Sequence, residues 1–88
     1  MTDTIFGKIT RGEIPTEFLH EDDHCVVIRD IHPQATTHVL IIPRKPIPKL
    51  SDAAPEDQAL LGHLLLVAGK VAQQLSVDNA FRLVINNG

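Results

Sequence analysis

The apolar positions of the chain fall into short β-branched runs and one longer stretch with helical spacing. Residues 25–30 and 39–42 contain the two clearest runs, and each is bounded by polar residues or proline. Short apolar runs with such boundaries predict buried strands. A further strand is expected to begin at residues 18–19, turn at residues 21–24 and pair with residues 25–30 as an antiparallel hairpin.

Two stretches predict helices, one short and one long. Residues 3–12 place apolar side chains on one face, and Gly12 is suited to end the helix. Residues 55–75 predict a long helix, because Pro55 fits a first helical turn and apolar residues then recur at helical spacing. The face expected to enter the core consists of Leu61, Leu64, Leu65, Ala68, Val71, Ala72 and Leu75.

A second stripe on this helix contains Gly62, Leu66, Gly69 and Gln73. Each glycine costs about 1 kcal/mol relative to alanine inside a helix, so another backbone is expected to approach closely. One explanation is that a glycine packs against the sheet. The other is a partner helix from a second copy, which predicts a homodimer through residues 55–75 and a sheet edge.

Residues 81–85 form another strongly apolar run and predict a strand that needs cover on both faces and a neighbour at its edge. The sequence given continues only to Asn86, Asn87 and Gly88. Asn-Gly normally begins a turn, and a turn leads to a further element. We therefore expect a single domain over residues 1–88 that is truncated at its C-terminus.

Composition restricts the function further. The 88 residues are 43% apolar, include three phenylalanines and carry a formal net charge of −3. These values favour one small domain with an aliphatic core and argue against nucleic acid as a partner. No apolar run is long enough for a membrane span, and the N-terminal residues do not resemble a signal peptide. The lone Cys25 fits a reducing compartment, so a cytoplasmic location is expected.

The polar residues near the strand ends leave several interpretations open. Asp30, beside apolar residues, could accept hydrogen bonds from sugar hydroxyls, or it could simply open a turn before Pro33. His20 and His24 have a metal-ligand spacing only on a helix, whereas here they fall on a strand and in a turn. We therefore expect no metal site. The basic segment 44–49 is interrupted by prolines and is expected to be a solvated loop.

Several motifs match one known family in order along the whole chain. They are Asp3-Thr4-Ile5-Phe6-Gly7-Lys8-Ile9, Gly12-Glu13-Ile14-Pro15, Glu21-Asp22-Asp23, Asp30-Ile31-His32-Pro33-Gln34-Ala35, Thr37-His38-Val39-Leu40-Ile41-Ile42-Pro43 and Phe81-Arg82-Leu83-Val84-Ile85-Asn86. In this combination the chain resembles a histidine triad (HIT) protein of the Hint branch, the purine nucleoside phosphoramidases.

The resemblance implies an α+β fold, with a mostly antiparallel five-stranded sheet, one short N-terminal helix and one long helix, assembled as a homodimer. It implies that Asp30 holds the ribose hydroxyls, that Asn86 reaches the phosphate and that His38 supports the catalytic histidines. Arg29 is expected at the edge of the base slot, where close relatives often have histidine. The implied apolar slot for the purine consists of Ile5, Phe6, Ile9, Ile14, Ile28 and Ile31.

Two departures from the family pattern change what is expected of this chain. Some bacterial relatives bind a structural zinc through a Cys-x-x-Cys pair, but Thr4 and Gly7 occupy those positions, so no zinc and no other cofactor is expected. The nucleophile belongs to a His-x-His-x-His motif, and no two histidines of this sequence have that spacing. In the family that nucleophile forms a nucleotidyl-histidine intermediate, which water then hydrolyses.

Three functional hypotheses follow from these observations. In the first, an intact parent protein hydrolyses purine nucleoside phosphoramidates or related nucleotides, and the 88 residues alone are inactive. In the second, the protein is a non-catalytic nucleotide-binding or regulatory dimer. In the third, it is a structural fragment with an incomplete site and no nucleotide affinity.

Overall fold

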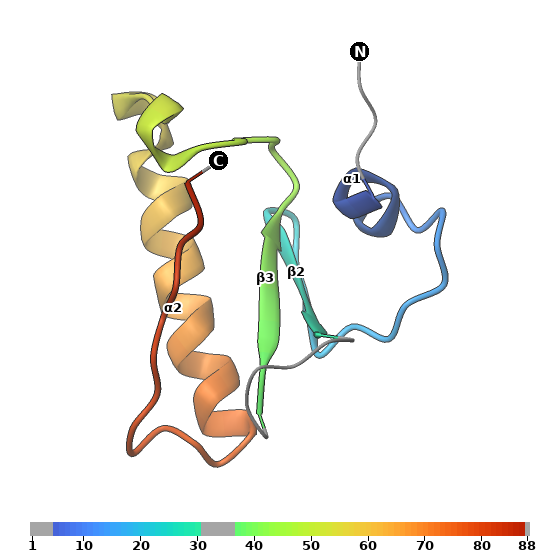
Figure 1. Ribbon diagram of the computed structural model, residues 1–88, viewed down its shortest axis with the longest axis vertical. Coiled ribbons are helices and arrows are strands. Elements are labelled where there is room, and N and C mark those ends of the chain that lie inside the picture. Colours follow the sequence, from blue (N-terminus) through green and yellow to red (C-terminus); the bar gives the residue numbers. More distant parts are fainter. Residues whose placement is uncertain (1–4, 31–36, 88) are drawn as a thin grey trace. The chain divides into compact units, whose positions relative to one another are not determined.

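The computed structural model describes residues 5–30 and 37–87 (Figure 1). It confirms the α+β class: a short N-terminal helix, an antiparallel sheet and a long helix occur in the expected order. The chain divides into two compact units, residues 1–46 and 47–88, and each is described separately.

The first helix of this unit is α1, Ile5–Thr10, and Gly12, the residue expected to end it, follows two positions later. Gly12 has φ +76°, the left-handed conformation that glycine adopts without a steric penalty. Its N–H donates to the Ile9 carbonyl at 3.1 Å, and the Glu13 N–H donates to the Lys8 carbonyl at 2.9 Å. These two bonds form a Schellman motif, which satisfies carbonyl groups that the last helical turn would otherwise leave unpaired.

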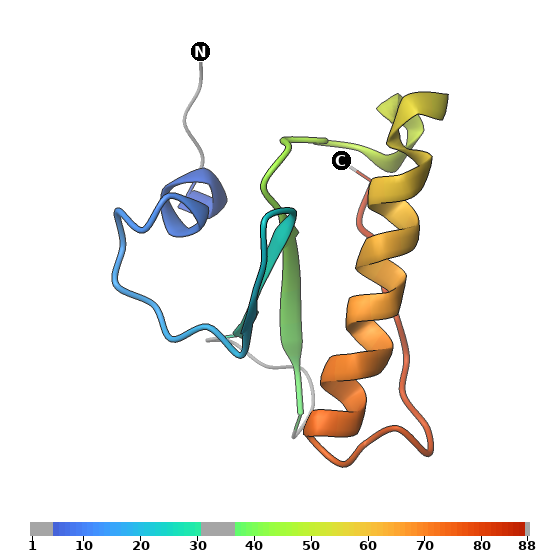
Figure 2. The ribbon, with the colours of Figure 1, turned by 180° about the vertical axis from the view of Figure 1, so that it is seen from behind.

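Three antiparallel strands follow, in the spatial order β1-β2-β3: His20–Glu21, Cys25–Arg29 and Val39–Pro43. The expected hairpin is confirmed, although β1 is only two residues long and starts after the predicted position. Figure 2 shows β2 beside β3. Their register pairs Val26 with Ile42 and Ile28 with Leu40. Because β2 has a neighbour on each side, its β-branched run occupies the centre of this sheet.

The core of the first unit lies between α1 and one face of the sheet. Ile9 from α1 packs with alternate residues of β2 and β3, and these side chains are at most 7% exposed. Alternation along each strand explains which of its residues enter this core, because every second side chain points to the same face. The buried members are Ile9, Val26, Ile28 and Ile42, with Ile14, Phe18 and Leu40 packed against them.

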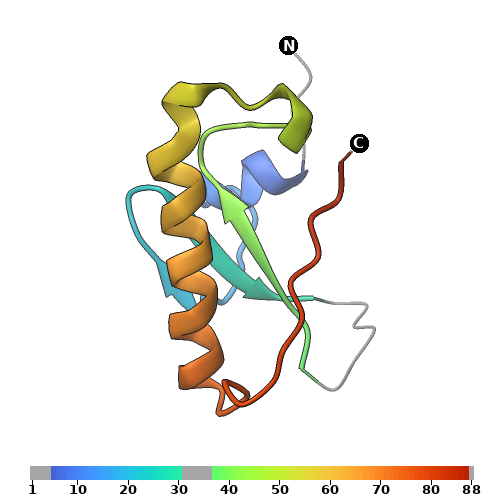
Figure 3. The same ribbon diagram turned by 90° about the vertical axis from the view of Figure 1, so that its left-hand side faces the viewer.

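The second unit is built on helix α2, Gln58–Gln74, which follows the 3-10 turns η1, Leu50–Asp52, and η2, Pro55–Asp57. Pro55 opens the helical region as expected, and the Asp57 carboxylate accepts a hydrogen bond from the Ala54 N–H at 2.9 Å. Figure 3 shows α2 as one continuous helix. The long helix is therefore confirmed: it ends one residue before the predicted position, whereas its first three predicted residues, Pro55–Asp57, form the 3-10 turn η2.

The buried face of α2 differs from the predicted face at two positions. Leu65 was expected in the core but is 56% exposed, whereas Val67 is 2% exposed. At about 100° per residue, Leu65 falls beyond the edge of the buried stripe and Val67 falls within it. The fully buried residues are Val67, Ala68, Val71 and Ala72, while Leu61, Leu64 and Leu75 are half-buried.

The predicted strand at 81–85 is wrong for the described chain. Residues 81–87 run without helix or strand, and Val84 and Ile85 are 73% and 62% exposed. A strand is defined by hydrogen bonds to a neighbouring strand, and β-branched composition cannot supply that neighbour. At the end of this segment, the Asn87 side-chain oxygen accepts a hydrogen bond from the Ser51 N–H at 2.9 Å.

Candidate functional site

The register of β2 and β3 places Asp30 directly opposite His38. Arg29 pairs with Val39, so the next position along the ladder joins Asp30 to His38, and the Asp30 N–H donates to the His38 carbonyl at 3.0 Å. The side chains also meet, with His38 Nδ1 3.4 Å from Asp30 Oδ2. The side chain of His38 is 30% exposed and that of Asp30 is 19% exposed, so both can be reached from solvent while the strands hold them in place.

This pair lies on the same sheet face as the core of the first unit. Side chains alternate along a strand, so Asp30 shares its face with Ile28, and His38 shares its face with Leu40. Ile28 packs with Ile9, and Ile14 lies against the same cluster. The carboxylate and imidazole therefore stand at the border of an aliphatic surface formed by α1 and the sheet.

Helix α1 extends that surface with exposed apolar side chains. Ile5 and Phe6 are 59% and 47% exposed, and they precede Ile9 by four and three positions on the same helix. Residues spaced in this way lie on one side of a helix. Of the six apolar residues expected around a purine, Ile9, Ile14 and Ile28 belong to the packed cluster, Ile5 and Phe6 are exposed on the same side of α1 as Ile9, and Ile31 lies outside the described residues.

Two other residues expected in the site, Arg29 and Asn86, do not belong to the sheet face that carries Asp30 and His38. Arg29 is exposed and, by strand alternation, lies on the opposite face of β2 from Ile28 and Asp30. Asn86 is exposed and belongs to the second unit. Contacts of Arg29 with a base and of Asn86 with a phosphate therefore stay predictions.

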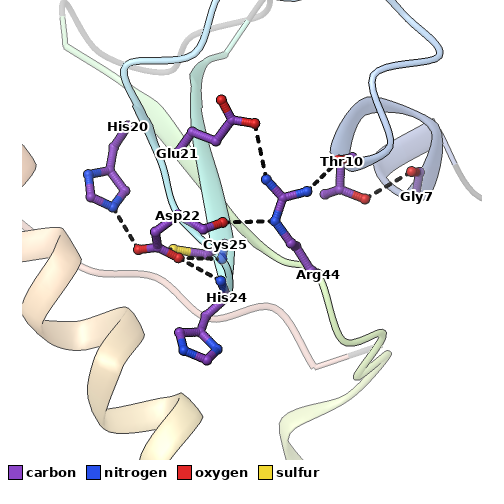
Figure 4. Close-up of polar contacts among 8 residues, drawn as sticks. All are labelled: Gly7, Thr10, His20, Glu21, Asp22, His24, Cys25 and Arg44. Atoms are coloured by element: carbon purple, nitrogen blue, oxygen red, sulfur yellow. Dashed lines mark hydrogen bonds and ion pairs between the residues drawn. The ribbon is translucent and has the colours of Figure 1, made fainter.

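Sequence inspection missed a compact polar cluster at the turn between β1 and β2, which Figure 4 shows. His20 Nε2 lies 2.8 Å from Asp22 Oδ2, and the Cys25 thiol lies 3.7 Å from the same oxygen. Asp22 Oδ1 accepts the N–H groups of His24 and Cys25 at 2.7 and 2.8 Å. The available signal was Asp22 itself, since an aspartate in a tight turn commonly accepts nearby backbone N–H groups.

The Cys25 thiol is fully buried. Burial, reinforced by the Asp22 carboxylate, raises the pKa of this thiol from 9.0 to about 11, although Arg44 acts in the opposite direction. A thiol with such a pKa stays protonated near neutral pH and is a poor nucleophile.

Arg44 corrects the expectation of a solvated basic loop. Its guanidinium donates to the Thr10 carbonyl at 2.6 Å, to the Asp22 carbonyl at 2.9 Å and to the Glu21 carboxylate at 3.1 Å (Figure 4). The three acceptors belong to the end of α1, to the end of β1 and to the β1–β2 turn. Arg44 therefore fixes the helix that carries Ile5 and Phe6 to the sheet, a contact between distant residues that local sequence does not reveal.

Comparison with known proteins identifies the family. The HIT domain model matches residues 11–88. The chain is 60% identical over 86 residues to an uncharacterized HIT-like protein of Synechocystis, covering 98% of this chain and 75% of that protein. It is 44% identical over 85 residues to the purine nucleoside phosphoramidase of Escherichia coli, covering 96% and 71%.

Solved structures give the same result. The crystal structure of a HIT family hydrolase from Legionella pneumophila is similar with a TM-score of 0.92 at 42% identity, covering 97% of this chain and 77% of that one. A HIT family hydrolase from Clostridium thermocellum has a TM-score of 0.93 at 32% identity, covering 100% of this chain and 77% of that one.

Within the described residues, no helix combines the length and apolar character needed to cross a membrane.

Proposed function

The chain belongs to the HIT domain family, and we propose that it binds a purine nucleotide against the face of the sheet that carries Asp30 and His38. The observation that supports this proposal is the position of Asp30, half-buried at the border of the aliphatic surface formed by α1, β2 and β3. A carboxylate accepts hydrogen bonds from two vicinal hydroxyls, and an apolar surface covers the flat base.

His38 adds a positioning element to this proposal. Its ring nitrogen lies 3.4 Å from Asp30 Oδ2, and the backbone bond between the two residues fixes their separation. The ribose would then meet a carboxylate whose orientation is set by β3, which limits the conformational entropy lost on binding.

Removing the Asp30 carboxylate tests the binding site. Hydrogen bonds to a charged group contribute about 1.5–3 kcal/mol each, so Asp30→Ala should weaken AMP binding by about 30-fold or more in calorimetric titration. Asp23→Ala is the matched control, because it removes the same charge from an exposed position at the other end of β2. Equal affinities of the Asp30→Ala and wild-type proteins would place the nucleotide elsewhere.

We further propose that the intact protein hydrolyses nucleoside phosphoramidates or related nucleotides. The support is the 44% identity to the Escherichia coli purine nucleoside phosphoramidase, of which this chain covers 71%. Covalent catalysis through a nucleotidyl-histidine needs an imidazole placed in line with the leaving group. None of the five histidines of this sequence stands in a His-x-His pair.

The 88 residues alone are therefore expected to bind nucleotide without turnover. Adenosine phosphoramidate should remain intact when incubated with the purified chain, while AMP still binds in the titration. Release of ammonia above the level of a heat-treated sample would contradict this expectation. A longer protein with the motif that binds AMP but does not cleave the phosphoramidate would favour the non-catalytic, regulatory alternative.

We also propose that a second copy packs on the exposed face of α2. An added Cβ at Gly62 or Gly69 would meet no heavy atom within 4 Å beyond its own helix and chain neighbours, so neither glycine is explained by a close approach among the described residues. Leu66, which belongs to this stripe, and the neighbouring Leu65 are 76% and 56% exposed. Two glycines beside exposed leucines are suited to close packing against a helix of another copy.

A further inference from the structure

We propose that His20, Asp22 and Cys25 form a binding site for a zinc-like divalent transition metal, with one imidazole, one carboxylate and one thiolate as ligands. One potential ligand atom of each residue lies within 4.8 Å of the other two. This proposal departs from the absence of a metal site expected from the sequence, because that expectation considered His20 with His24 and not the residues across the turn.

The local fold explains why three residues close in sequence converge. His20 pairs with Val27 across the hairpin, so His20 lies on the same sheet face as Val27 and Cys25. Asp22 reaches this face from the turn, where its Oδ1 is held by the N–H groups of His24 and Cys25. The second carboxylate oxygen is thereby directed toward the imidazole and the thiol (Figure 4).

Two of the three ligand separations can be compared with those of a tetrahedral site. Zinc bound at about 2.0–2.3 Å by nitrogen, oxygen and sulfur has neighbouring ligand atoms about 3.4–3.6 Å apart. The observed separation from the Cys25 sulfur to Asp22 Oδ2 is 3.7 Å, which fits directly. The 2.8 Å between His20 Nε2 and Asp22 Oδ2 must open by about half an ångström to meet the same geometry.

Charge and access also suit a divalent ion. Zn²⁺ with one thiolate and one carboxylate is formally neutral, which lowers the cost of holding it near a buried strand. The side chains of His20 and Asp22 are 20% and 24% exposed, which gives the metal a path from solvent to the buried sulfur. A metal-coordinated thiol loses its proton, which is released to solvent, so the protonated state without metal does not prevent binding.

The choice of metal follows from the ligand types. A thiolate and an imidazole favour zinc over magnesium or calcium, and three protein ligands leave a fourth position for water. This site is on the opposite face of the sheet from Asp30, so it is independent of the proposed nucleotide site. The simpler interpretation is that the His20–Asp22 ion pair only stabilises the turn, and it predicts no thiolate coordination.

Cobalt(II) titration of the full, reduced chain distinguishes these interpretations. We expect one equivalent of Co²⁺ to give a thiolate-to-cobalt charge-transfer band and the visible absorption of a tetrahedral ion, both abolished by added Zn²⁺. Cys25→Ser should remove the charge-transfer band. His20→Ala, which leaves the Asp22 turn contacts intact, should weaken binding by about tenfold or more and covers the case in which Cys25→Ser does not fold.

Two variants serve as controls and keep the test separate from nucleotide binding. Asp23→Asn alters the neighbouring carboxylate of the same turn, and Asp30→Asn alters the other sheet face; both should bind Co²⁺ like the wild type. A wild-type spectrum without a charge-transfer band at saturating Co²⁺ would overturn the proposal. So would a band that persists in Cys25→Ser, or unchanged affinity in His20→Ala.

Discussion

Asp22 organises the β1–β2 turn at the scale of single residues. One carboxylate oxygen accepts two backbone N–H groups, and the other faces His20 and the Cys25 thiol. These contacts place a carboxylate beside a buried sulfur, and this proximity contributes to the raised pKa of Cys25. Burial of Cys25 is the larger cause of this raised pKa, and the turn residue Asp22 adds to it.

The raised pKa of Cys25 predicts a pH dependence of stability. The folded protein keeps the thiol protonated up to about pH 11, whereas in the unfolded chain it ionises near 9.0. The unfolded state therefore binds fewer protons between these values, and the free energy of unfolding should fall by about 2 kcal/mol as pH rises from 9 to 11.

Urea unfolding at a series of pH values, with a chelator present, measures this contribution. Cys25→Ala is the control, since it lacks the thiol and keeps every other ionisable side chain of the wild type. The difference in unfolding free energy between the two proteins should be constant below pH 9 and shrink above it. A difference that is independent of pH would show that Cys25 ionises alike in the folded and unfolded states.

The two helices end in the same way at the scale of elements. α1 ends at Gly12 with φ +76°, and α2 is followed by Ser76 with φ +61°. After α2, the Val77 N–H donates to the Ala72 carbonyl at 2.9 Å and the Ser76 N–H to the Gln73 carbonyl at 3.1 Å, which is again a Schellman motif. The left-handed position holds glycine in one helix and serine in the other.

Exchanging these residues should change stability in opposite directions. Gly12→Ala introduces a side chain into a left-handed position and should lower the free energy of unfolding by about 1 kcal/mol. Ser76→Gly removes such a penalty and should raise it by up to about 1 kcal/mol, less the entropy that glycine adds to the unfolded chain. Chemical denaturation of both variants checks the signs, and a stabilising Gly12→Ala would contradict this account.

Predictability differs between elements for a physical reason. The two helices and the hairpin turn depend on local residues such as Gly12, Pro55 and Asp22, and the sequence predicted all three elements, with boundaries that differ from the structure by up to three residues. The segment 81–85 has the composition of a strand, but a strand also needs a partner that composition cannot specify. Arg44 was missed for the same reason, because its acceptors in α1 and the β1–β2 turn are distant in sequence.

At the scale of the whole molecule, the fold and the family say more about the role of Asp30 than its neighbours in sequence do. Residues taken singly left Asp30 undecided between a turn and a sugar-binding group. The register, which sets Asp30 opposite His38 beside the α1 surface, gives the first structural support for the second interpretation. The chain spans about three quarters of the relatives it matches, so the activity of the whole protein stays a proposal.

Oligomeric state is the second prediction at this scale. Gly62→Leu should convert a dimer to a monomer in light scattering, because a bulky side chain would fill the stripe between Leu65 and Leu66. The substitution also raises helix propensity, so loss of the dimer would not reflect unfolding of α2. Gln74→Leu, on another exposed side of the helix, should leave the mass unchanged. An unaltered dimer mass in Gly62→Leu would place the interface elsewhere.

The most direct test of the central claim is a double-mutant cycle between Asp30 and the ribose. The affinities of the wild type and Asp30→Ala are measured for AMP and for its 2′,3′-dideoxy analogue. Loss of the hydroxyls should weaken wild-type binding by about 30-fold, or about 2 kcal/mol, and weaken Asp30→Ala binding hardly at all. Equal losses in both proteins would show that Asp30 does not hold the ribose and would contradict the proposed nucleotide site.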